Sequence, residues 1–249
     1  MSATPLFSII TITYNAASTI VPTLHSVEAQ GYKNYEYIVV DGKSSDDTLS
    51  LVKNSSLTAR IISEPDKGLY DAMNKGIDLA RGEYLIFLNA GDAFHTPETL
   101  QDIANSIGNK RPGVIYGETA IVDENRRFIM MRRLKAPQQL TWRSFANGML
   151  VCHQAFIARR DIAPHYDLQY RYSSDVDWCI RCMKKTDELH NTHLTLIDYL
   201  NEGETTRHHK ASLKERFHIM CHYYGYIPTV IRHIKFAIRH IIARCRGKY

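Results

Sequence analysis

The chain has 249 residues, of which 44% are hydrophobic and 23% are charged. This length and composition are enough for one large domain or two small ones, and they exclude a disordered chain. No stretch offers the roughly 20 uninterrupted apolar residues of a membrane span. Five cysteines at irregular spacing argue against a secreted disulfide framework, and Phe7–Thr13 lacks the basic flank of a signal peptide. We therefore expect a cytoplasmic protein.

Charge is unevenly distributed along the chain. The segment from Lys210 to Tyr249 holds nine Lys or Arg and one Glu, a net +8, so the first 209 residues carry −3 of the total +5. A basic tail on a mildly acidic body predicts an anionic partner for the tail, either a membrane surface or nucleic acid.

The first half of the chain alternates strand and helix patterns. Strands are expected at residues 8–15, 35–42, 59–65 and 84–88, with helices at 20–30, through Val52, at 69–80 and from near Pro97. This repeated order predicts an α/β fold with a doubly wound, mostly parallel sheet and helices on both faces.

The pattern changes after about Gly117. We expect a hairpin over 119–134 that turns at Asp123–Asn125, strands at His153–Arg160 and Leu194–Leu200, and a helix at Val176–Lys185. No internal repeat or flexible linker interrupts the chain, so the second half is expected to extend the same sheet.

Polar side chains follow each of the first four predicted strands. Because the carboxyl ends of parallel strands meet at one edge of a sheet, we expect these side chains to converge. They are Tyr14 and Asn15 after the first strand, Asp41 and Gly42 after the second, Asp66, Lys67 and Gly68 after the third, and Asn89–Asp92 after the fourth.

The chemistry of these clusters fits a nucleoside diphosphate. The ring of Tyr14 suits stacking on a base, Asp41 suits hydrogen bonds from a base or ribose, and Lys67 suits a phosphate. Asp92, beside the amide of Asn89, suits a hard cation that bridges to phosphate oxygens. Each residue alone is more often a turn residue, a partly buried ring or a solvated charge. Four clusters at four consecutive strand ends favour a binding site.

The segments SIITITYN, VVDGKSSDDT, EPDKGLYDAMNKGI and GEYLIFLNAGD, in this order and spacing, resemble family 2 glycosyltransferases of the GT-A fold, of the bacterial polysaccharide-biosynthesis type. The resemblance is close over roughly the first 115 residues and looser to about residue 205. It implies an inverting enzyme that moves a sugar from a nucleotide donor, UDP-linked, with Mg²⁺ or Mn²⁺ as cofactor.

Matching positions imply nucleoside contacts for Tyr14 and Asp41 and a metal-ligand role for Asp92. The family pattern often has Asp-x-Asp-Asp after the strand, where this chain has Asn89-Ala90-Gly91-Asp92. Only one carboxylate remains, so we expect the cation to be held largely by Asp92 and the donor phosphates, with Asn89 offering a neutral oxygen.

The second half is expected to supply the acceptor side and a general base. In an inverting displacement the acceptor hydroxyl loses its proton as it attacks, and a carboxylate is the usual group for that task. The segment SSDVDW resembles the acidic motif of the family, and its Asp175 matches the base position. Asp177 is expected to support the helix N-terminus, although both residues could simply cap that helix. Asp167 and Glu202 rank lower.

Two other groups have metal-ligand residue types. Cys179 and Cys182 form a CxxC, but their place in an amphipathic helix and the lack of a second CxxC favour burial in the core. His208 and His209 lie where this fold can return a C-terminal His to the metal. Paired His in a basic tail more often only adds charge.

The end of the chain, from Tyr226 to Arg246, has the pattern of an amphipathic helix. Its apolar stripe consists of Ile227, Val230, Ile231, Ile234, Ile238, Ile241 and Ile242. Arg232, Lys235, Arg239 and Arg246 lie opposite, with Arg244 at the boundary. Such a helix either packs on the body or lies in the plane of an anionic leaflet, where it would bring the enzyme to a lipid-linked acceptor.

These observations predict a GT-A catalytic domain over residues 1–205, with a nucleotide-sugar half (1–116) and an acceptor half (117–205), and a basic helical tail over 206–249. The expected function is transfer of a sugar from a nucleotide sugar to a glycan or lipid-linked acceptor in cell-surface polysaccharide biosynthesis. We expect it at the inner face of the cell membrane, with no nucleic-acid partner.

There are three alternative functions for such a chain. A nucleotidyltransferase would show a Gly-rich loop followed by Arg or Lys after the first strand, and a dinucleotide oxidoreductase would show G-x-G-x-x-G there; TYNAAST is neither. The third is a catalytically weak protein that binds nucleotide sugars and whose metal site has decayed, as the NAGD segment suggests.

Overall fold

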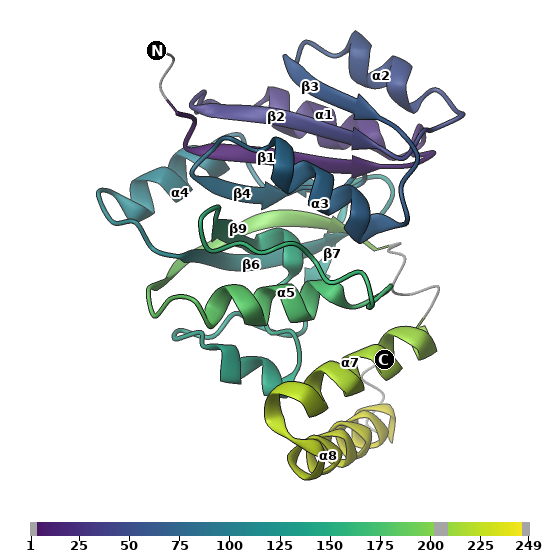
Figure 1. Ribbon diagram of the computed structural model, residues 1–249, viewed down its shortest axis with the longest axis vertical. Coiled ribbons are helices and arrows are strands. Elements are labelled where there is room, and N and C mark those ends of the chain that lie inside the picture. Colours follow the sequence, from purple (N-terminus) through teal and green to yellow (C-terminus); the bar gives the residue numbers. More distant parts are fainter. Residues whose placement is uncertain (1–3, 202–208, 246–249) are drawn as a thin grey trace.

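The computed structural model describes residues 4–201 and 209–245. Its centre is a nine-stranded sheet in the order β3-β2-β1-β4-β8-β6-β9-β5, with β7 paired to β6 (Figure 1). The strands are β1 (Phe7–Thr13), β2 (Tyr35–Asp41), β3 (Ala59–Ser63), β4 (Tyr84–Phe87), β5 (Ala93–Phe94), β6 (Val114–Val122), β7 (Phe128–Met131), β8 (Phe156–Arg159) and β9 (Leu189–Leu200).

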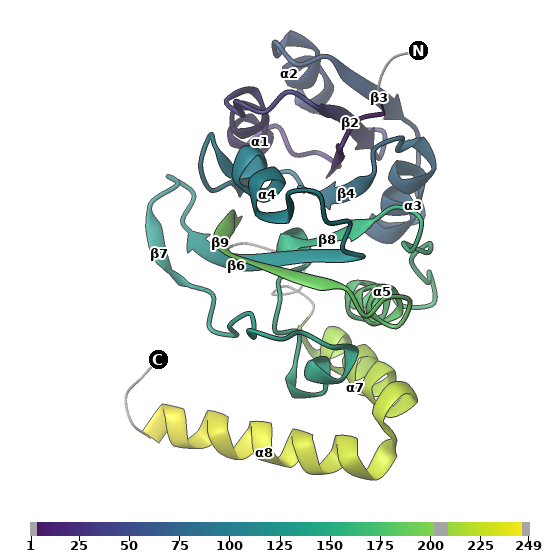
Figure 2. The same ribbon diagram turned by 90° about the vertical axis from the view of Figure 1, so that its left-hand side faces the viewer.

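Helices cover both faces of this sheet. Figure 2 shows α1 and α4 on one side and α3 and α5 on the other. The helices are α1 (Ile20–Glu28), α2 (Thr48–Asn54), α3 (Leu69–Leu79), α4 (Thr99–Ile107), α5 (Ser174–Met183), α7 (His209–Tyr224) and α8 (Tyr226–Cys245), with 3-10 helices η1 (Trp142–Asn147) and η2 (His153–Ala155). This layering confirms the α/β fold class.

The N-terminal half of the sheet is parallel, as its strand-helix order predicts. β1 lies between β2 and β4, with Thr13 opposite Asp41 and Ile10 opposite Phe87. Every residue of β1 and β4 is buried, because helices cover the strands on both faces. This register brings the carboxyl ends of the strands to one edge, which positions the site described below.

The sheet becomes mixed beyond β4. β8 runs antiparallel to both β4 and β6, whereas β9 is parallel to β6. The expected hairpin is confirmed as β6 and β7, closed by hydrogen bonds between Asp123 and Arg127. The strand expected from His153 is partly wrong. Residues 153–155 form η2, closed by the Ala155 N–H donating to the Cys152 carbonyl at 3.0 Å, so three successive side chains turn inward.

Two helices end the described chain. α7 packs on α5 and η1, and its Ile219 lies in the hydrophobic core. The helix expected from Tyr226 is confirmed as α8, which follows Gly225 and runs along the end of the molecule opposite β3 (Figures 1 and 2). None of the helices within residues 4–201 and 209–245 combines the length and apolar character that crossing a bilayer requires.

Candidate active site

A cavity of about 550 Å³ opens at the edge of the sheet where β1 and β4 end. Both halves of the chain line it. The strand ends contribute Tyr14, Asn15, Asn89 and Asp92, α3 contributes Tyr70, the η1–η2 region contributes Met149, His153 and Gln154, and α5 and α7 contribute Asp175 and Arg216. The ends of the first and fourth predicted strands and the acidic motif of the second half therefore line one cavity.

The end of β1 presents an exposed ring beside a tightly bonded loop. Tyr14 is 65% exposed and lines the cavity, so one face of its ring is accessible to a ligand. Asn15 has a φ of 47° in the left-handed region, and its Oδ1 accepts a hydrogen bond from the Ser45 N–H at 2.9 Å. Its N–H donates to Ser44 Oγ at 2.8 Å. Asn15 thus ties the end of β1 to the loop after β2.

Asp41 is fully buried and holds neighbouring loops together. One carboxylate oxygen accepts hydrogen bonds from the Ser44 N–H at 3.0 Å and from Ser63 Oγ at 2.6 Å. The other accepts one from the Ser44 hydroxyl. Within the described part of the chain, Asp41 is not among the cavity-lining residues. Its predicted contact with the nucleoside stays a prediction.

The segment after β3 lies beside this loop. A Cβ added at Gly42 would come within 2.5 Å of Asp66 Oδ2 and 3.2 Å of the Tyr14 ring, so these three residues are in close contact. Asp66 also accepts a hydrogen bond from the Gly68 N–H at 2.8 Å. Lys67 is exposed, and neither it nor Asp66 is among the described residues that line the cavity. The predicted cluster is therefore spatially adjacent, but only part of it faces the cavity.

Asp92 lines the cavity and is only 4% exposed, whereas a polar residue in a turn directly after a strand would be expected to face solvent. Two distant segments cover it. Gln154 Nε2 donates to Oδ2 at 2.8 Å, and the Leu200 N–H donates to Oδ1 at 3.2 Å. Burial raises the pKa of Asp92 to about 7, against the lowering effect of these donors and of Arg126.

The oxygen atoms near the end of β4 suit a hard cation. Asn89 Oδ1 is buried without a hydrogen-bond partner among the described residues, and it shares the cavity with Asp92. Carboxylate and amide oxygens are ligands of Mg²⁺. Within residues 4–201 and 209–245, no group of three or more His, Cys, Asp or Glu is placed to hold a metal ion. These two oxygens therefore fit part of a coordination shell that a diphosphate would have to complete.

Several lower-ranked residues are accounted for differently. Glu202 and His208 lie outside the described residues, as does the side chain of His209. Asp167 accepts a hydrogen bond from the Gln169 N–H at 3.0 Å, within its own loop. Cys179 and Cys182 are fully buried in α5, and burial raises the pKa of both thiols above the usual range.

The two carboxylates of the acidic motif have different surroundings. Asp175, in the first turn of α5, lines the cavity and accepts a hydrogen bond from the Tyr70 hydroxyl at 3.1 Å. Asp177 is buried, pairs with Arg181 at 2.6 Å and accepts a hydrogen bond from the Tyr223 hydroxyl at 2.7 Å. Asp177 therefore joins α5 to α7, whereas Asp175 faces the cavity.

A stack of aromatic rings fixes the Tyr70 hydroxyl. Tyr70 stacks on Tyr166 at 5.4 Å between ring centroids, and Tyr166 stacks on Trp178 at 4.9 Å. The Tyr166 hydroxyl lies 2.6 Å from His153 Nε2. Burial lowers the pKa of His153 to about 4, which keeps this ring neutral near pH 7. The partner of Asp175 is thus held by a rigid, buried assembly.

Sequence patterns did not identify Tyr70, Gln154 or Arg216 as site residues. Tyr70 lies inside the motif EPDKGLYDAMNKGI, so that motif offered a signal. Gln154 fell in a predicted strand, and Arg216 was counted only as one of the basic residues of the tail. Neither has a local pattern, because their contacts to the cavity depend on how distant segments pack.

The chain is similar in sequence to known proteins. The family model "Glycosyl transferase family 2" matches residues 8–166. A PGL/p-HBAD biosynthesis glycosyltransferase of Mycobacterium bovis (strain BCG / Pasteur 1173P2) is 36% identical over 192 residues, covering 72% of this chain and 70% of the relative. The amylovoran biosynthesis glycosyltransferase AmsB of Erwinia amylovora is 30% identical over 196 residues, covering 72% of this chain and 64% of AmsB.

Solved structures share the fold. The crystal structure of S. aureus TarS 1-349 in complex with UDP-GlcNAc superimposes with a TM-score of 0.70 at 21% identity. The match covers 86% of this chain and 64% of the TarS chain, so this chain spans less than two thirds of that neighbour. The family resemblance of the sequence motifs is confirmed by these findings: this chain belongs to glycosyl transferase family 2.

Proposed function

We propose that the protein is an inverting glycosyltransferase that transfers a sugar from a UDP-sugar to a glycan or lipid-linked acceptor in cell-surface polysaccharide biosynthesis. The observation that carries this proposal is the single cavity shared by Tyr14, Asp92 and Asp175. The TarS neighbours in complex with UDP-GlcNAc and UDP support a UDP-linked donor, and the biosynthetic names of the mycobacterial and Erwinia relatives support the pathway class.

The acceptor side of the reaction centres on Asp175. Its carboxylate takes the proton of the acceptor hydroxyl as that oxygen bonds to the anomeric carbon of the donor sugar. The bond from the anomeric carbon to the diphosphate oxygen breaks on the opposite face, and its electron pair leaves with UDP. The Tyr70 hydroxyl, 3.1 Å from Asp175, orients the carboxylate for this transfer.

The donor side lies at the ends of β1 and β4. The accessible ring of Tyr14 suits stacking on the uracil base, and Asp92 and Asn89 would hold a Mg²⁺ or Mn²⁺ ion beside the diphosphate. Such an ion, when bound, neutralises the charge that develops on the leaving UDP.

The direct test is a panel of UDP-sugars incubated with the full chain and Mn²⁺, with release of UDP as the readout. We expect turnover with at least one donor, and Asp175→Asn should lower its transfer rate by about 100-fold or more while UDP affinity is kept. Asp167→Asn, in the neighbouring loop, is the matched control. Binding of a nucleotide sugar without hydrolysis or transfer would contradict the proposal and favour a catalytically weak binding protein.

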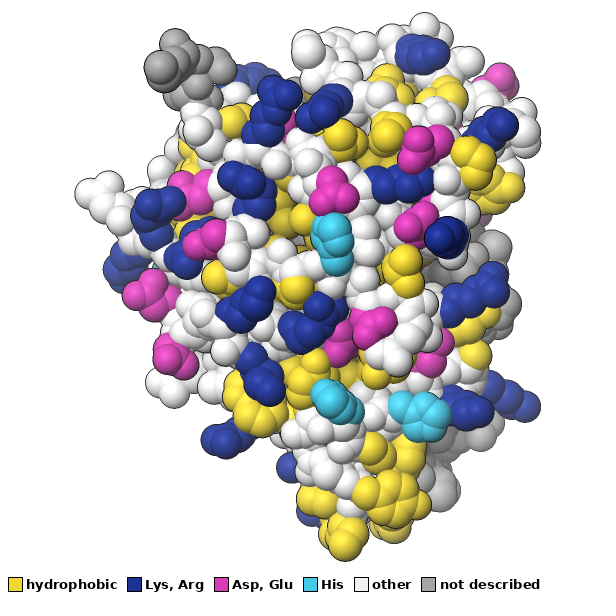
Figure 3. Space-filling view, in the orientation of Figure 1, with side chains coloured by type: hydrophobic (Ala, Val, Ile, Leu, Met, Phe, Trp, Pro, Cys, Tyr) yellow, Lys and Arg dark blue, Asp and Glu magenta, His cyan; other side chains and the backbone are white. Residues whose placement is uncertain are grey.

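We also propose that α8 attaches the enzyme to an anionic membrane surface, at the inner face of the cell membrane. Ile227, Ile231, Ile234 and Ile238 are all exposed, and Ile227 reaches 71%. Figure 3 shows hydrophobic side chains gathered at this end of the molecule. An amphipathic helix with Arg and Lys beside an exposed apolar stripe suits an interfacial position.

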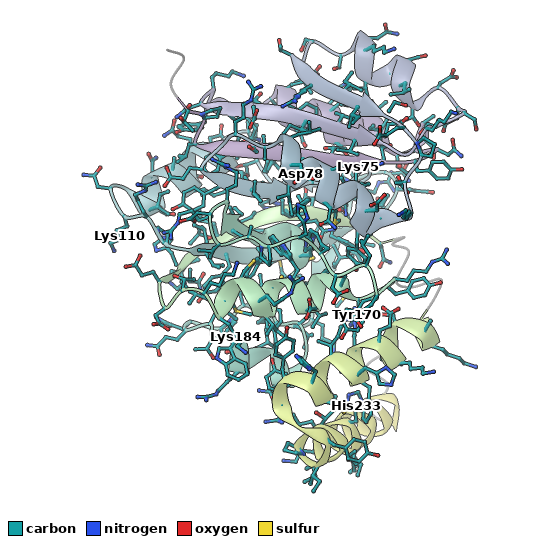
Figure 4. All side chains as sticks on the ribbon, viewed as in Figure 1. Lys75, Asp78, Lys110, Tyr170, Lys184 and His233 are labelled. Atoms are coloured by element: carbon teal, nitrogen blue, oxygen red, sulfur yellow. The ribbon has the colours of Figure 1, made fainter. Side chains whose placement is uncertain are left out.

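The opposite face of α8 packs against the body. Thr229 is fully buried, and the ring of His233 lies 5.1 Å from that of Phe217 on α7. Figure 4 shows His233 at the junction of the two helices. At 3.6 residues per turn, the described isoleucines lie about half a turn from Thr229. Packing of α8 therefore leaves its apolar stripe facing away from the protein, which supports the membrane interpretation over burial on the domain.

A further inference from the structure

Arg216 of α7 brings a guanidinium into the cavity beside the proposed base. It lines the cavity together with Tyr70 and Asp175. Its Nε atom is buried and has no hydrogen-bond partner among the described residues. A buried donor of a charged group is costly without an acceptor, so this position favours an anionic ligand.

Among the described residues that line the cavity, a second arginine, Arg132, has a structural role. Arg132 donates to the carbonyl oxygens of Leu134, Met149 and Leu150 at 2.7 to 3.2 Å, and so holds the segment after β7 against the η1–η2 loop. Its guanidinium is engaged by the backbone. Arg216 is therefore the better placed of the two to bind a ligand.

Arg216 acts on the acceptor side of the cavity. Burial raises the pKa of Tyr70, and among the smaller effects the charge of Arg216 lowers it. The cation that acts on Asp92 at the strand end is instead Arg126. Arg216 is thus electrostatically coupled to Tyr70, whose hydroxyl donates to Asp175.

α7 holds Arg216 in a fixed position relative to the base. Glu215, the preceding residue, accepts hydrogen bonds from the N–H groups of Arg171 and Tyr172 at 2.9 and 2.8 Å. The hydroxyls of Ser212 and Ser173 lie 3.0 Å apart. These contacts join α7 to the loop that starts α5, the helix carrying the base.

α7 also lies between α5 and α8 (Figures 1 and 2). With the apolar stripe of α8 on a membrane, α7 forms the wall of the cavity nearer the lipid. A sugar carried by a lipid phosphate would enter along this wall with its phosphate on the membrane side of the sugar. A guanidinium pairs with phosphate through two parallel hydrogen bonds.

We propose that Arg216 binds the phosphate that joins the acceptor sugar to its lipid, which makes the acceptor a sugar linked to a lipid through phosphate. The inference rests on the proposed function and specifies its acceptor class. The donor diphosphate offers the same chemistry, and the experiment separates the two sources.

The experiment measures binding of octyl phosphate, octyl glucoside and UDP to the full chain by calorimetry. Arg216→Gln should lower the affinity for octyl phosphate by at least about 10-fold. It should leave the affinities for UDP and octyl glucoside within about twofold of those of the original protein. Arg216→Lys keeps the positive charge but loses the two parallel hydrogen bonds of a guanidinium. Its affinity for octyl phosphate should therefore lie between those of Arg216→Gln and the original protein. Lys214→Gln removes a neighbouring exposed charge of α7 and should change nothing.

Two results would overturn the proposal. If Arg216→Gln lowers the affinity for UDP as much as the affinity for octyl phosphate, Arg216 binds the donor. If octyl phosphate fails to bind the original protein, or binds all variants alike, the arginine has no such role. Because this readout needs no turnover, it is independent of whether any UDP-sugar is transferred, so failure of the proposed function is detected separately.

Discussion

At the scale of single residues, hydrogen bonds from distant segments hold the two carboxylates of the candidate site in place. Asp92 is served by Gln154 and the backbone of Leu200, and Asp175 by Tyr70. Each of these partners comes from a segment distant in sequence. A substitution at a partner therefore tests the site without removing the carboxylate itself.

Asp92→Asn should lower turnover by about 100-fold or more, because an amide supplies one neutral oxygen where a carboxylate supplies charge. It should also destabilise the fold by about 1–3 kcal/mol, since the amide nitrogen would face one of two buried donors. UDP release and thermal unfolding measure the two effects. Asp187→Asn, at an exposed loop, is the control and should show neither. Full activity of the Asp92 variant, or of the original protein in excess chelator, would reject the metal role.

Tyr70→Phe removes the hydroxyl that Asp175 accepts from and keeps the ring that stacks on Tyr166. A hydrogen bond to a charged group contributes about 1.5–3 kcal/mol, so kcat should fall by about 10-fold or more. UDP affinity should stay unchanged, because the variant leaves the strand ends intact. Tyr32→Phe, whose ring packs on Phe7 away from the cavity, is the matched control. Unchanged kcat in the Tyr70 variant would show that Asp175 needs no orienting partner.

At the scale of elements, α7 connects the base-carrying helix α5 to the terminal helix α8. Tyr223 bonds to Asp177 on α5, and the Tyr224 hydroxyl donates to the Trp142 carbonyl of η1 at 2.6 Å. Lys184, labelled in Figure 4, lies over the rings of Trp142 and Tyr223. These contacts anchor α7 at its C-terminal end.

Asp177→Ala should destabilise the protein by about 2–4 kcal/mol, because it leaves Arg181 and the Tyr223 hydroxyl without their partner at a largely buried position. Urea unfolding measures this. The comparison is Asp161→Ala, which breaks the more exposed pair with Arg159 and should cost less than about 1 kcal/mol. Equal losses in the two variants would mean that the contact between α5 and α7 adds little to stability.

Sequence patterns identified the elements of the N-terminal half because their signals are local. The apolar run of β4 and the stripe of α3 are visible within a dozen residues, and parallel pairing then places Tyr14 near Asp92. The burial of Asp92 could not be predicted, because it comes from Gln154 and Leu200, which belong to the second half of the chain and reach Asp92 through long-range packing. The helical turn of η2 and the cavity role of Arg216 were missed for the same reason.

At the scale of the whole molecule, the exposed apolar side chains are placed so that the protein could bind a membrane in one orientation. The edge strand β7 exposes Phe128, Ile129 and Met130 on the side of the molecule, and α8 exposes its isoleucines at one end. The α8 face lies beyond α7, which lines the cavity. Of these two surfaces, the α8 face is the one that has a helical apolar stripe with basic residues alongside, and so it determines how we expect the enzyme to sit on a membrane.

The double change Ile231→Ser and Ile234→Ser should release the protein from anionic vesicles, because it removes apolar side chains that are 49% and 54% exposed. Thermal stability and UDP affinity should be retained, since the packed face around Thr229 is untouched. Sedimentation with phosphatidylglycerol vesicles at low and high salt measures binding. High salt should further weaken any residual binding of the double variant, because it screens the attraction of the basic residues to anionic lipid. Phe128→Ser with Met130→Ser removes a comparable apolar surface from β7 and should leave binding unchanged. If the β7 pair releases the protein and the α8 pair does not, the membrane-facing surface is the β7 edge, and the approach of a lipid-linked acceptor past α7 fails with it.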